Sequence, residues 1–240
     1  MNRYINLVFF GGMILMNYLA NALPMNGKTT GELSEAYPNL FVPAGITFSI
    51  WGLIYLLLAG FCVIQFSQKG APVAESIGWL FAVSCLLNGL WIVAWHYEKV
   101  PLSLLVMAGL LATLILINLK LQGQPLGLTK AAFGIYLGWI SIATIANVTA
   151  LLVRLNWNGF GISQEIWAVV MIAVGAAIVS VAIVKLANPF LGLAVVWAFA
   201  GIILKRSQDY TSIVVTAALG ILIVAAVTVR AFLRRGVGPV

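Results

Sequence analysis

The chain has 240 residues, of which 62% are hydrophobic and 8% charged, whereas ordinary soluble domains carry about 25% charged residues. This composition and the mean hydropathy of +1.08 exclude a soluble globular domain and predict an integral membrane protein. The net charge of +7 does not indicate nucleic-acid binding, because the basic residues stand mostly singly at the ends of apolar runs.

Long continuous apolar runs predict transmembrane helices and exclude a β-barrel, because about 20 apolar residues cross a bilayer core of about 30 Å. The first run resembles a signal peptide in its Arg3 and its Ala20-Asn21-Ala22, but its length favours a retained helix. The seventh run, which begins at Pro189, is the shortest. The eight runs cover roughly residues 5–23, 44–66, 77–97, 101–120, 133–154, 164–187, 189–204 and 210–232.

The basic residues predict the orientation of these spans. Eight of the thirteen Lys and Arg residues fall on the side of the N-terminus, and five on the other side. Because cytoplasmic connections carry the excess of Lys and Arg, we expect both termini in the cytoplasm, with the bacterial inner membrane as the host membrane. The five residues on the opposite side are Lys28, Lys99, Arg154, Lys205 and Arg206.

Residues 24–42 form the longest polar connection. This segment combines Tyr37, Pro38 and Phe41 with Gly and Asn turn formers. Two interpretations remain open: a lid that folds back over the helix ends, or a mobile surface loop with interfacial aromatic residues.

Three of the predicted helices each carry a tryptophan within a stripe of aromatic or polar residues. In the second helix, Phe48, Trp51 and Tyr55 follow Pro43 at spacings of i, i+3 and i+7, which places them on one face. The third and fifth helices repeat the device. Their stripes are Asn88, Trp91 and Trp95, and then Tyr136, Trp139, Ala143 and Asn147.

These tryptophans lie too deep to be ordinary interfacial anchors. Trp51, Trp91 and Trp139 stand about six residues or more inside their helices, which is around 9 Å at 1.5 Å per residue. Their indole N–H groups therefore need partners within the protein. Asn88 and Asn147 either bond helix to helix or line a pocket for a flat apolar ligand, and the sequence leaves both interpretations open.

Catalytic and metal-binding signatures are missing from the sequence. One His, no central carboxylate and no Cys-His or Ser-His-Asp grouping leave no catalytic residue and no metal site to name. We expect His96 to be an interfacial polar residue, with axial ligation of an iron porphyrin as the alternative. Cys62 and Cys85 are expected to pack as small hydrophobic residues.

The last three runs, residues 164–232, resemble helices that pack closely and carry no ionisable residue inside a span. Small residues recur four apart in each of them, which allows close helix approach. The pairs are Ala173 and Ala177, Ala194 and Ala198, and Thr216 and Gly220.

The three stripes resemble the TspO family, the tryptophan-rich sensory or translocator proteins, over residues 1–158. Pro43, Trp51 and Tyr55 match the family pattern of its second helix in spacing, and Asn88 with Trp91 matches its Asn-x-x-Trp. The fifth-helix pattern is matched by Tyr136, Trp139 and Asn147. The resemblance implies an all-α membrane protein with a five-helix TspO-like bundle (1–158), followed here by a three-helix extension (159–240).

The second helix also departs from the family pattern. The first Pro of the expected pair is Val42, the early Trp is Gly45, and the Phe position is Thr47. We expect these changes to reshape the mouth of the pocket and so to reset the choice of ligand.

The resemblance implies a receptor, sensor or transfer protein that binds a planar hydrophobic ligand, either a tetrapyrrole such as protoporphyrin or haem, or a sterol-like lipid. No cofactor is required beyond such a bound molecule. The lid residues would be Tyr37 and Phe41. The pocket residues would be Pro43, Phe48, Trp51, Tyr55, Asn88, Trp91, Trp95, Tyr136, Trp139 and Asn147.

Two alternatives stay open: an enzyme that degrades porphyrin with light or oxygen, and a small-molecule transporter. The residues favour a non-enzymatic role. The bilayer and a small hydrophobic ligand are the expected partners, and nucleic acid is not. Homodimerisation is implied by the resemblance, and the extension is expected to cover part of the surface that a second subunit would use.

Overall fold

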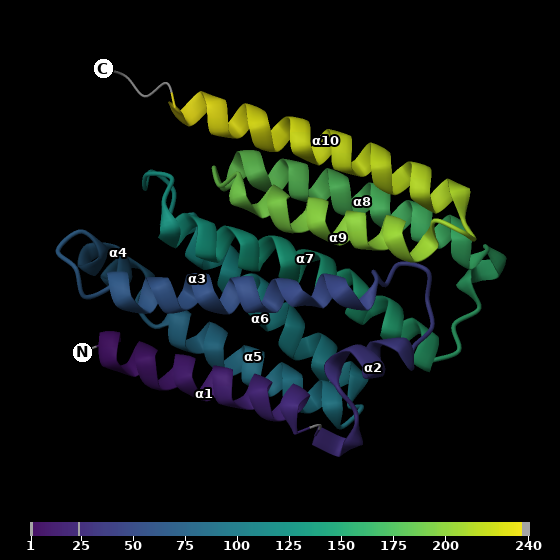
Figure 1. Ribbon diagram of the computed structural model, residues 1–240, viewed down its shortest axis with the longest axis horizontal. Helices are drawn as coiled ribbons and strands as arrows, with labels where there is room; N and C mark the ends of the chain where they lie inside the picture. Colours follow the sequence, from purple (N-terminus) through teal and green to yellow (C-terminus); the bar gives the residue numbers. More distant parts are fainter. Residues whose placement is uncertain (1, 24, 237–240) are drawn as a thin grey trace.

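The computed structural model describes residues 2–23 and 25–236, and over these residues it is helical, without a strand (Figure 1). Eight long helices appear in the predicted order, which confirms the all-α membrane fold. They are α1 (Asn2–Ala22), α3 (Ile50–Ile64), α5 (Leu80–His96), α6 (Val100–Lys120), α7 (Leu128–Arg154), α8 (Gln164–Lys185), α9 (Phe190–Arg206) and α10 (Thr211–Gly236).

Short helices fill the connections at both ends of the bundle. The turn η1 (Met25–Gly27) and the helix α2 (Thr30–Glu35) form the first connection, and η2 (Gly45–Ser49) leads into α3. The turn η3 (Gly159–Gly161) precedes α8. At the opposite end α4 (Gly70–Ile77) meets α5 at a bend of 62°, because Gly78 adopts a φ of 61° that breaks the helix.

Within the described residues, six helical segments are long and apolar enough to cross a membrane: α1, η2 with α3, α6, α7, α8 and α10. The bent pair of α4 and α5 makes a seventh if it counts as one span. Helix α9, with 17 residues, stands at the lower limit of spanning length. It runs beside α10 for most of its length (Figure 1). The shortest of the predicted runs therefore forms a continuous helix of the bundle.

Helix α7 lies at the centre, in contact with α3, α6, α8 and α9. Close approach of α9 depends on glycine, since a Cβ added at Gly138 would overlap the backbone carbonyl of Leu191. Gly134 likewise accommodates the side chain of Asn188. The division of the chain at residue 158 stays a prediction, because the two parts share this tightly packed seam.

The small residues of the last three helices are used differently from one helix to the next. Ala194 and Ala198 are fully buried, as their spacing predicts. In α8 the predicted pair Ala173 and Ala177 is exposed, and the packed positions are Gly175 and Ala176. The spacing therefore identified a close-packed bundle but the wrong face of α8.

Helix α9 also docks on the segment that leads into α3. The Ala44 N–H donates to the Gly201 carbonyl at 3.0 Å, and the Trp197 indole donates to the Thr47 carbonyl at 2.8 Å. A Cβ on Gly201 would overlap the Thr47 side chain. Helix α9 is thus bonded directly to the segment that precedes α3, the helix that carries Trp51.

Candidate functional site

Seven of the ten predicted pocket residues line one cavity between α3, α5, α7 and the connection 24–42. The cavity measures about 40 Å³, which accommodates water-sized guests but not a drug-sized or larger ligand, for which sites of about 300 Å³ or more are usual. The seven residues are Pro43, Phe48, Trp51, Trp91, Trp95, Trp139 and Asn147.

A column of aromatic rings, most of them stacked, runs between these helices. Tyr37 lies over Trp95 with ring centroids 5.7 Å apart, and Trp95 stacks on Trp91 at 6.1 Å and 17°. Trp91 stacks on Trp51 at 6.2 Å, and Trp51 stacks on Tyr55 at 5.6 Å. The stripes predicted separately on α3 and α5 thus form one continuous column that the first connection covers.

Trp139 of α7 closes the column from the side. Its ring meets Trp51 edge to face at 6.2 Å and Phe48 edge to face at 5.7 Å. Edge-to-face and offset pairs of this kind are favourable beyond the area that they bury. The closed arrangement is therefore stable as it stands, and a ligand must displace ring contacts to enter.

Three buried indole groups beside the cavity have no hydrogen-bond partner among the described residues. These are the Nε1 atoms of Trp91, Trp95 and Trp139, whose side chains are 6%, 5% and 3% exposed. A buried donor left without an acceptor costs about 1–3 kcal/mol. Buried donors without a partner in a native structure call for an explanation, and three around one cavity are available to a water molecule or a ligand that enters it.

Asn88 and Tyr136 lie behind the cavity and bond helix to helix. The Asn17 amide donates to Asn88 Oδ1 at 2.7 Å, and the Asn88 amide donates to the Tyr136 hydroxyl at 2.9 Å. This chain joins α1, α5 and α7. Of the two interpretations of Asn88, the structure shows the interhelical one, whereas Asn147 lines the cavity and accepts a bond from Ser103 at 3.1 Å.

Several lining residues escaped the sequence analysis. Thr30, Ser34 and Asn39 come from the first connection, which folds back on itself and so has no periodicity that could predict its contacts. Val42 lines the cavity as well, and it was already expected at the mouth of the pocket. Ala146 and Ala150 extend the stripe of α7. The spacing from Tyr136 could have identified these two alanines.

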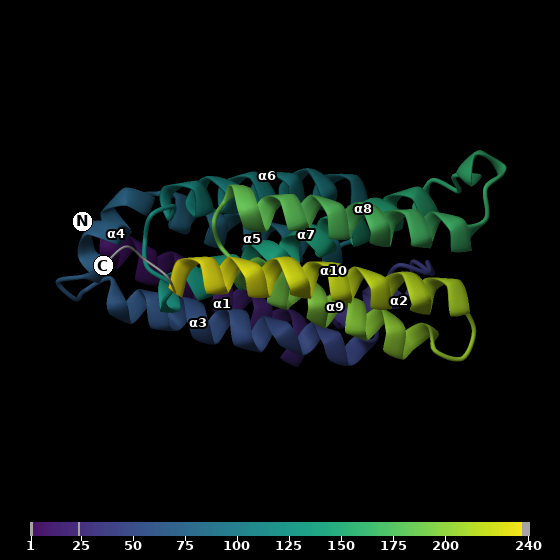
Figure 2. The same ribbon diagram turned by 90° about the horizontal axis from the view of Figure 1, so that it is seen from above.

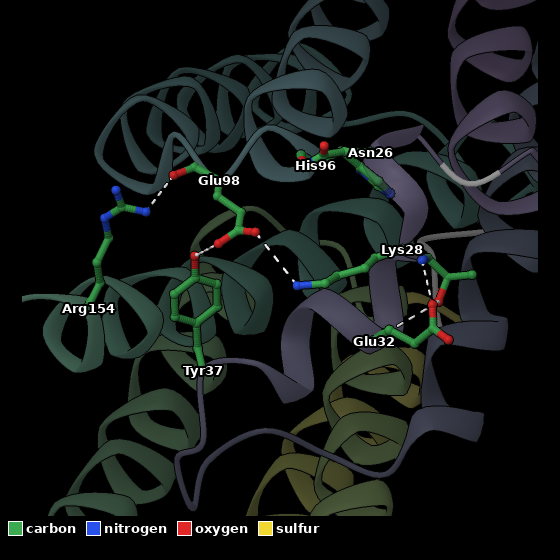
Figure 3. A network of polar contacts seen from close by, with 8 residues as sticks. Asn26, Lys28, Glu32, Tyr37, His96, Glu98 and Arg154 are labelled. Atoms are coloured by element: carbon green, nitrogen blue, oxygen red, sulfur yellow. Dashed lines mark hydrogen bonds and ion pairs between the residues drawn. The ribbon is translucent and has the colours of Figure 1, made fainter.

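The connection 24–42 is held down by a polar network on one side (Figure 3). The Glu98 carboxylate accepts a bond from the Tyr37 hydroxyl at 3.1 Å and pairs with Lys28 at 3.7 Å. Arg154 donates to the Glu98 carbonyl at 2.6 Å, and Asn26 donates to the His96 carbonyl at 3.0 Å (Figure 3). This arrangement supports the lid interpretation over the mobile loop.

Arg206 of α9 holds the other side of the same connection. Its guanidinium donates to the carbonyls of Asn39 at 2.7 Å and Leu40 at 3.2 Å. Asn39 in turn accepts bonds from the backbone N–H groups of Phe41 and Val42 at 3.1 Å each. We call residues 24–42 the lid from here on, because both of its edges are attached to the helix ends that surround the cavity.

Two groups of the lid have shifted pKa values. Burial raises the pKa of Tyr37, and its hydrogen bond to Glu98 acts in the same direction, while Arg154 opposes the shift. The backbone N–H of Thr29 lowers the pKa of Glu32, helped by the Thr29 hydroxyl. Thr29 and Glu32 form a capping box at the start of α2.

Two larger cavities adjoin the small one. A crevice of about 420 Å³ between α1 and α3 contains Tyr55 and shares Thr30, Phe48 and Trp51 with it. A second cavity, of about 450 Å³, lies between the lid, the end of α7 and the start of α8, where it contains the predicted lid residue Phe41. Trp51 therefore stands between the small cavity and a larger crevice.

His96 is not the interfacial residue that its place in the sequence suggested. Its side chain is fully buried, because the lid covers the end of α5. One ring nitrogen contacts the Ile92 carbonyl at 2.8 Å, and Nε2 has no partner in the described part of the chain.

Cys62 and Cys85 are both free and buried.

Among the described residues, no group of three His, Cys, Asp or Glu side chains could hold a metal ion.

The three departures from the family pattern have different surroundings. Val42 lines the small cavity. Thr47 is buried against Gly201 of α9, and neither it nor Gly45 lines that cavity. Thr47 therefore lies where α9 docks, Gly45 is exposed, and only Val42 alters the cavity wall itself.

In a comparison with known families, a family model described as TSPO-like protein matches residues 3–230. No curated protein and no solved structure matches the chain. The matched stretch contains every residue that lines the small cavity and continues through α8 and α9 into α10.

Proposed function

The chain belongs to the TSPO-like family of integral membrane proteins, and from this we propose that it senses or transfers a flat, apolar molecule that carries hydrogen-bond acceptors. The family indicates a membrane sensor or transporter type of function. The observation that carries the proposal is the set of three unpartnered indole N–H groups, on Trp91, Trp95 and Trp139, beside one aromatic cavity.

The chemistry of the wall suggests the class of ligand. Aromatic faces suit a planar apolar body, and indole N–H groups suit neutral or anionic oxygen and nitrogen acceptors. The described wall of the cavity contains no charged side chain. A tetrapyrrole such as protoporphyrin or haem, or a sterol-like lipid, combines such a body with acceptors at its edge.

Binding such a molecule requires the site to open. A cavity of about 40 Å³ is several times too small for a ring system of this size. A shift of Trp51 would join it to the crevice of about 420 Å³ between α1 and α3. The lid, attached at Glu98 and Arg206, would set how often the other end of the site opens.

Quenching of tryptophan fluorescence by protoporphyrin in detergent or nanodiscs tests the proposal. We expect saturable quenching at micromolar concentrations. Trp91→Phe and Trp139→Phe keep a ring but remove the donor, so each should weaken binding about tenfold, the equivalent of about 1.4 kcal/mol. Trp79→Phe is the matched control, because Trp79 is 54% exposed and lies outside the cavity wall.

Absence of saturable binding by protoporphyrin, haem and cholesterol would overturn the proposal. So would equal effects of Trp139→Phe and Trp79→Phe.

The same sample separates binding from the two alternatives. The column of redox-active rings from Tyr37 to Tyr55 is the feature that favours porphyrin breakdown. Loss of the porphyrin absorption band over time, with protein below stoichiometry and under light or oxygen, would show an enzyme. Movement of porphyrin across reconstituted vesicles would show a transporter, and stable binding alone would show a sensor or transfer protein.

A further inference from the structure

A further groove lies beside α7, and Ile142 is the one residue that it shares with the small aromatic cavity. It measures about 390 Å³ and is bounded by α6, α7 and α8. Figure 2 shows α6 and α8 along the same side of the bundle, and α7 contacts both of them. Leu111 and Ile115 of α6 face Ile178 and Ala182 of α8 across this groove.

The groove is apolar although two hydroxyl side chains line it. The Ser141 hydroxyl donates to the Leu137 carbonyl at 2.8 Å, and the Thr144 hydroxyl donates to the Ile140 carbonyl at 2.7 Å. Both donors are therefore satisfied within α7 itself. A hydrocarbon chain fits such a wall, whereas a polar ligand would find no free hydroxyl donor on α7.

The length of the groove matches one leaflet of a bilayer. Along α8 it runs from Gly175 to Lys185, and ten residues of helix rise about 15 Å. Half of a hydrocarbon core of about 30 Å is the same length. The groove thus begins near the middle of the membrane and ends at one surface.

Positive charge stands at that surface. Lys185 lines the end of the groove and is exposed. The Gln122 amide donates to the Lys185 carbonyl at 2.6 Å, which brings the end of α6, with exposed Lys120, to the same place. Neither lysine forms an ion pair within the described residues. Glu75, an acidic residue at this end of the bundle, pairs with Arg3 instead.

We propose that this groove binds an anionic phospholipid, with one acyl chain between α6 and α8 and the phosphate headgroup at Lys185 and Lys120. Lysines at the membrane surface attract anionic headgroups, and basic pockets between transmembrane helices hold them selectively. The bound acyl chain fills the gap between α6 and α8.

Native mass spectrometry of the full-length protein released from nanodiscs tests the proposal. The nanodiscs contain equal amounts of phosphatidylglycerol and phosphatidylcholine with identical acyl chains. We expect preferential retention of phosphatidylglycerol. The double variant Lys120→Gln with Lys185→Gln should reduce that preference about tenfold. The control removes the same charge elsewhere at this end, with Lys69→Gln and Arg230→Gln, both exposed in the structure.

A second variant tests the groove independently of charge. Ala182→Leu places bulk inside the groove and should lower retention of both lipids, while an unchanged melting temperature in detergent reports that the variant is folded. Equal retention of the two lipids by the unchanged protein overturns the proposal. It is also overturned if the lysine variant behaves like its control, or if cross-linking shows a second copy of the chain seated between α6 and α8.

Discussion

The part of the chain before residue 158 and the part after it achieve stable packing by different means. Of the fifteen buried polar or charged side chains among the described residues, thirteen precede residue 158, and Asn188 and Thr228 follow it. The C-terminal helices meet through small residues instead, as Gly192 does against Thr228 and Gly220 against Phe199.

The difference follows from the bilayer. Lipid tails are as apolar as Leu, so helices in a membrane associate through close packing or through interhelical hydrogen bonds. Close packing through small residues is sufficient to hold the C-terminal helices together. The proposed site needs side chains with hydrogen-bonding capacity held in defined positions, and the N-terminal part contains most of the buried polar side chains.

The largest expected effect breaks the seam between the two parts. Gly138→Ala places a Cβ against the Leu191 backbone, so we expect a loss of about 3 kcal/mol in the free energy of unfolding or failure to fold. Gly11→Ala is the control, because a Cβ there meets nothing within 4 Å. Thermal unfolding in detergent measures both, and equal melting temperatures would contradict a glycine-dependent seam.

The next effect tests the hydrogen-bonded packing of the first part. Asn88→Leu removes the acceptor that the Asn17 amide has on α5 and the donor to the Tyr136 hydroxyl, which should cost about 2 kcal/mol, although the Asn17 amide keeps its bond to the Met13 carbonyl. Thr144→Val, which removes a hydroxyl bonded only within its own helix, should cost less than about 0.5 kcal/mol. If both variants unfold at the same temperature, the hydrogen bonds that join Asn17, Asn88 and Tyr136 contribute no more to stability than a hydroxyl bonded within one helix.

A smaller effect concerns the attachment of the lid to the C-terminal part. Arg206→Gln removes the bonds to the Asn39 and Leu40 carbonyls, so the Phe41 and Val42 amides should exchange about fivefold faster, the equivalent of about 1 kcal/mol. Lys205→Gln changes the charge equally without touching those bonds. Unchanged exchange in Arg206→Gln would show that α9 does not restrain the lid.

The smallest effect is the acid sensitivity of α2. Because the pKa of Glu32 is lower in the folded protein than its ordinary 4.5, its contribution to stability is complete above that value. The contribution is lost as pH falls through the folded pKa. Amide exchange of residues 30–35, corrected for intrinsic rates, should show weaker protection at about pH 3 than at about pH 6. Glu32→Gln should remove this pH dependence, and persistence of the dependence would assign it to another group.

Much of the fold and part of the site could be predicted from the amino-acid sequence. A helix in a bilayer must be long, apolar and internally bonded, so hydropathy locates the helices. Helical periodicity then places Trp51 with Tyr55, and Trp91 with Trp95, on common faces, and the structure stacks both pairs. These features depend on residues near one another in the sequence.

What only the tertiary structure decided depends on residues far apart in the sequence. Periodicity cannot show that the Arg206 guanidinium binds the Asn39 carbonyl. Nor can it show that the Thr47 side chain packs against Gly201, or that the lid buries His96. The stripes left open whether these side chains join helices or line a pocket, and in the structure the rings pack against one another and leave about 40 Å³. A helical pattern determines which face a side chain occupies, whereas the partner of that face is determined by how the helices pack.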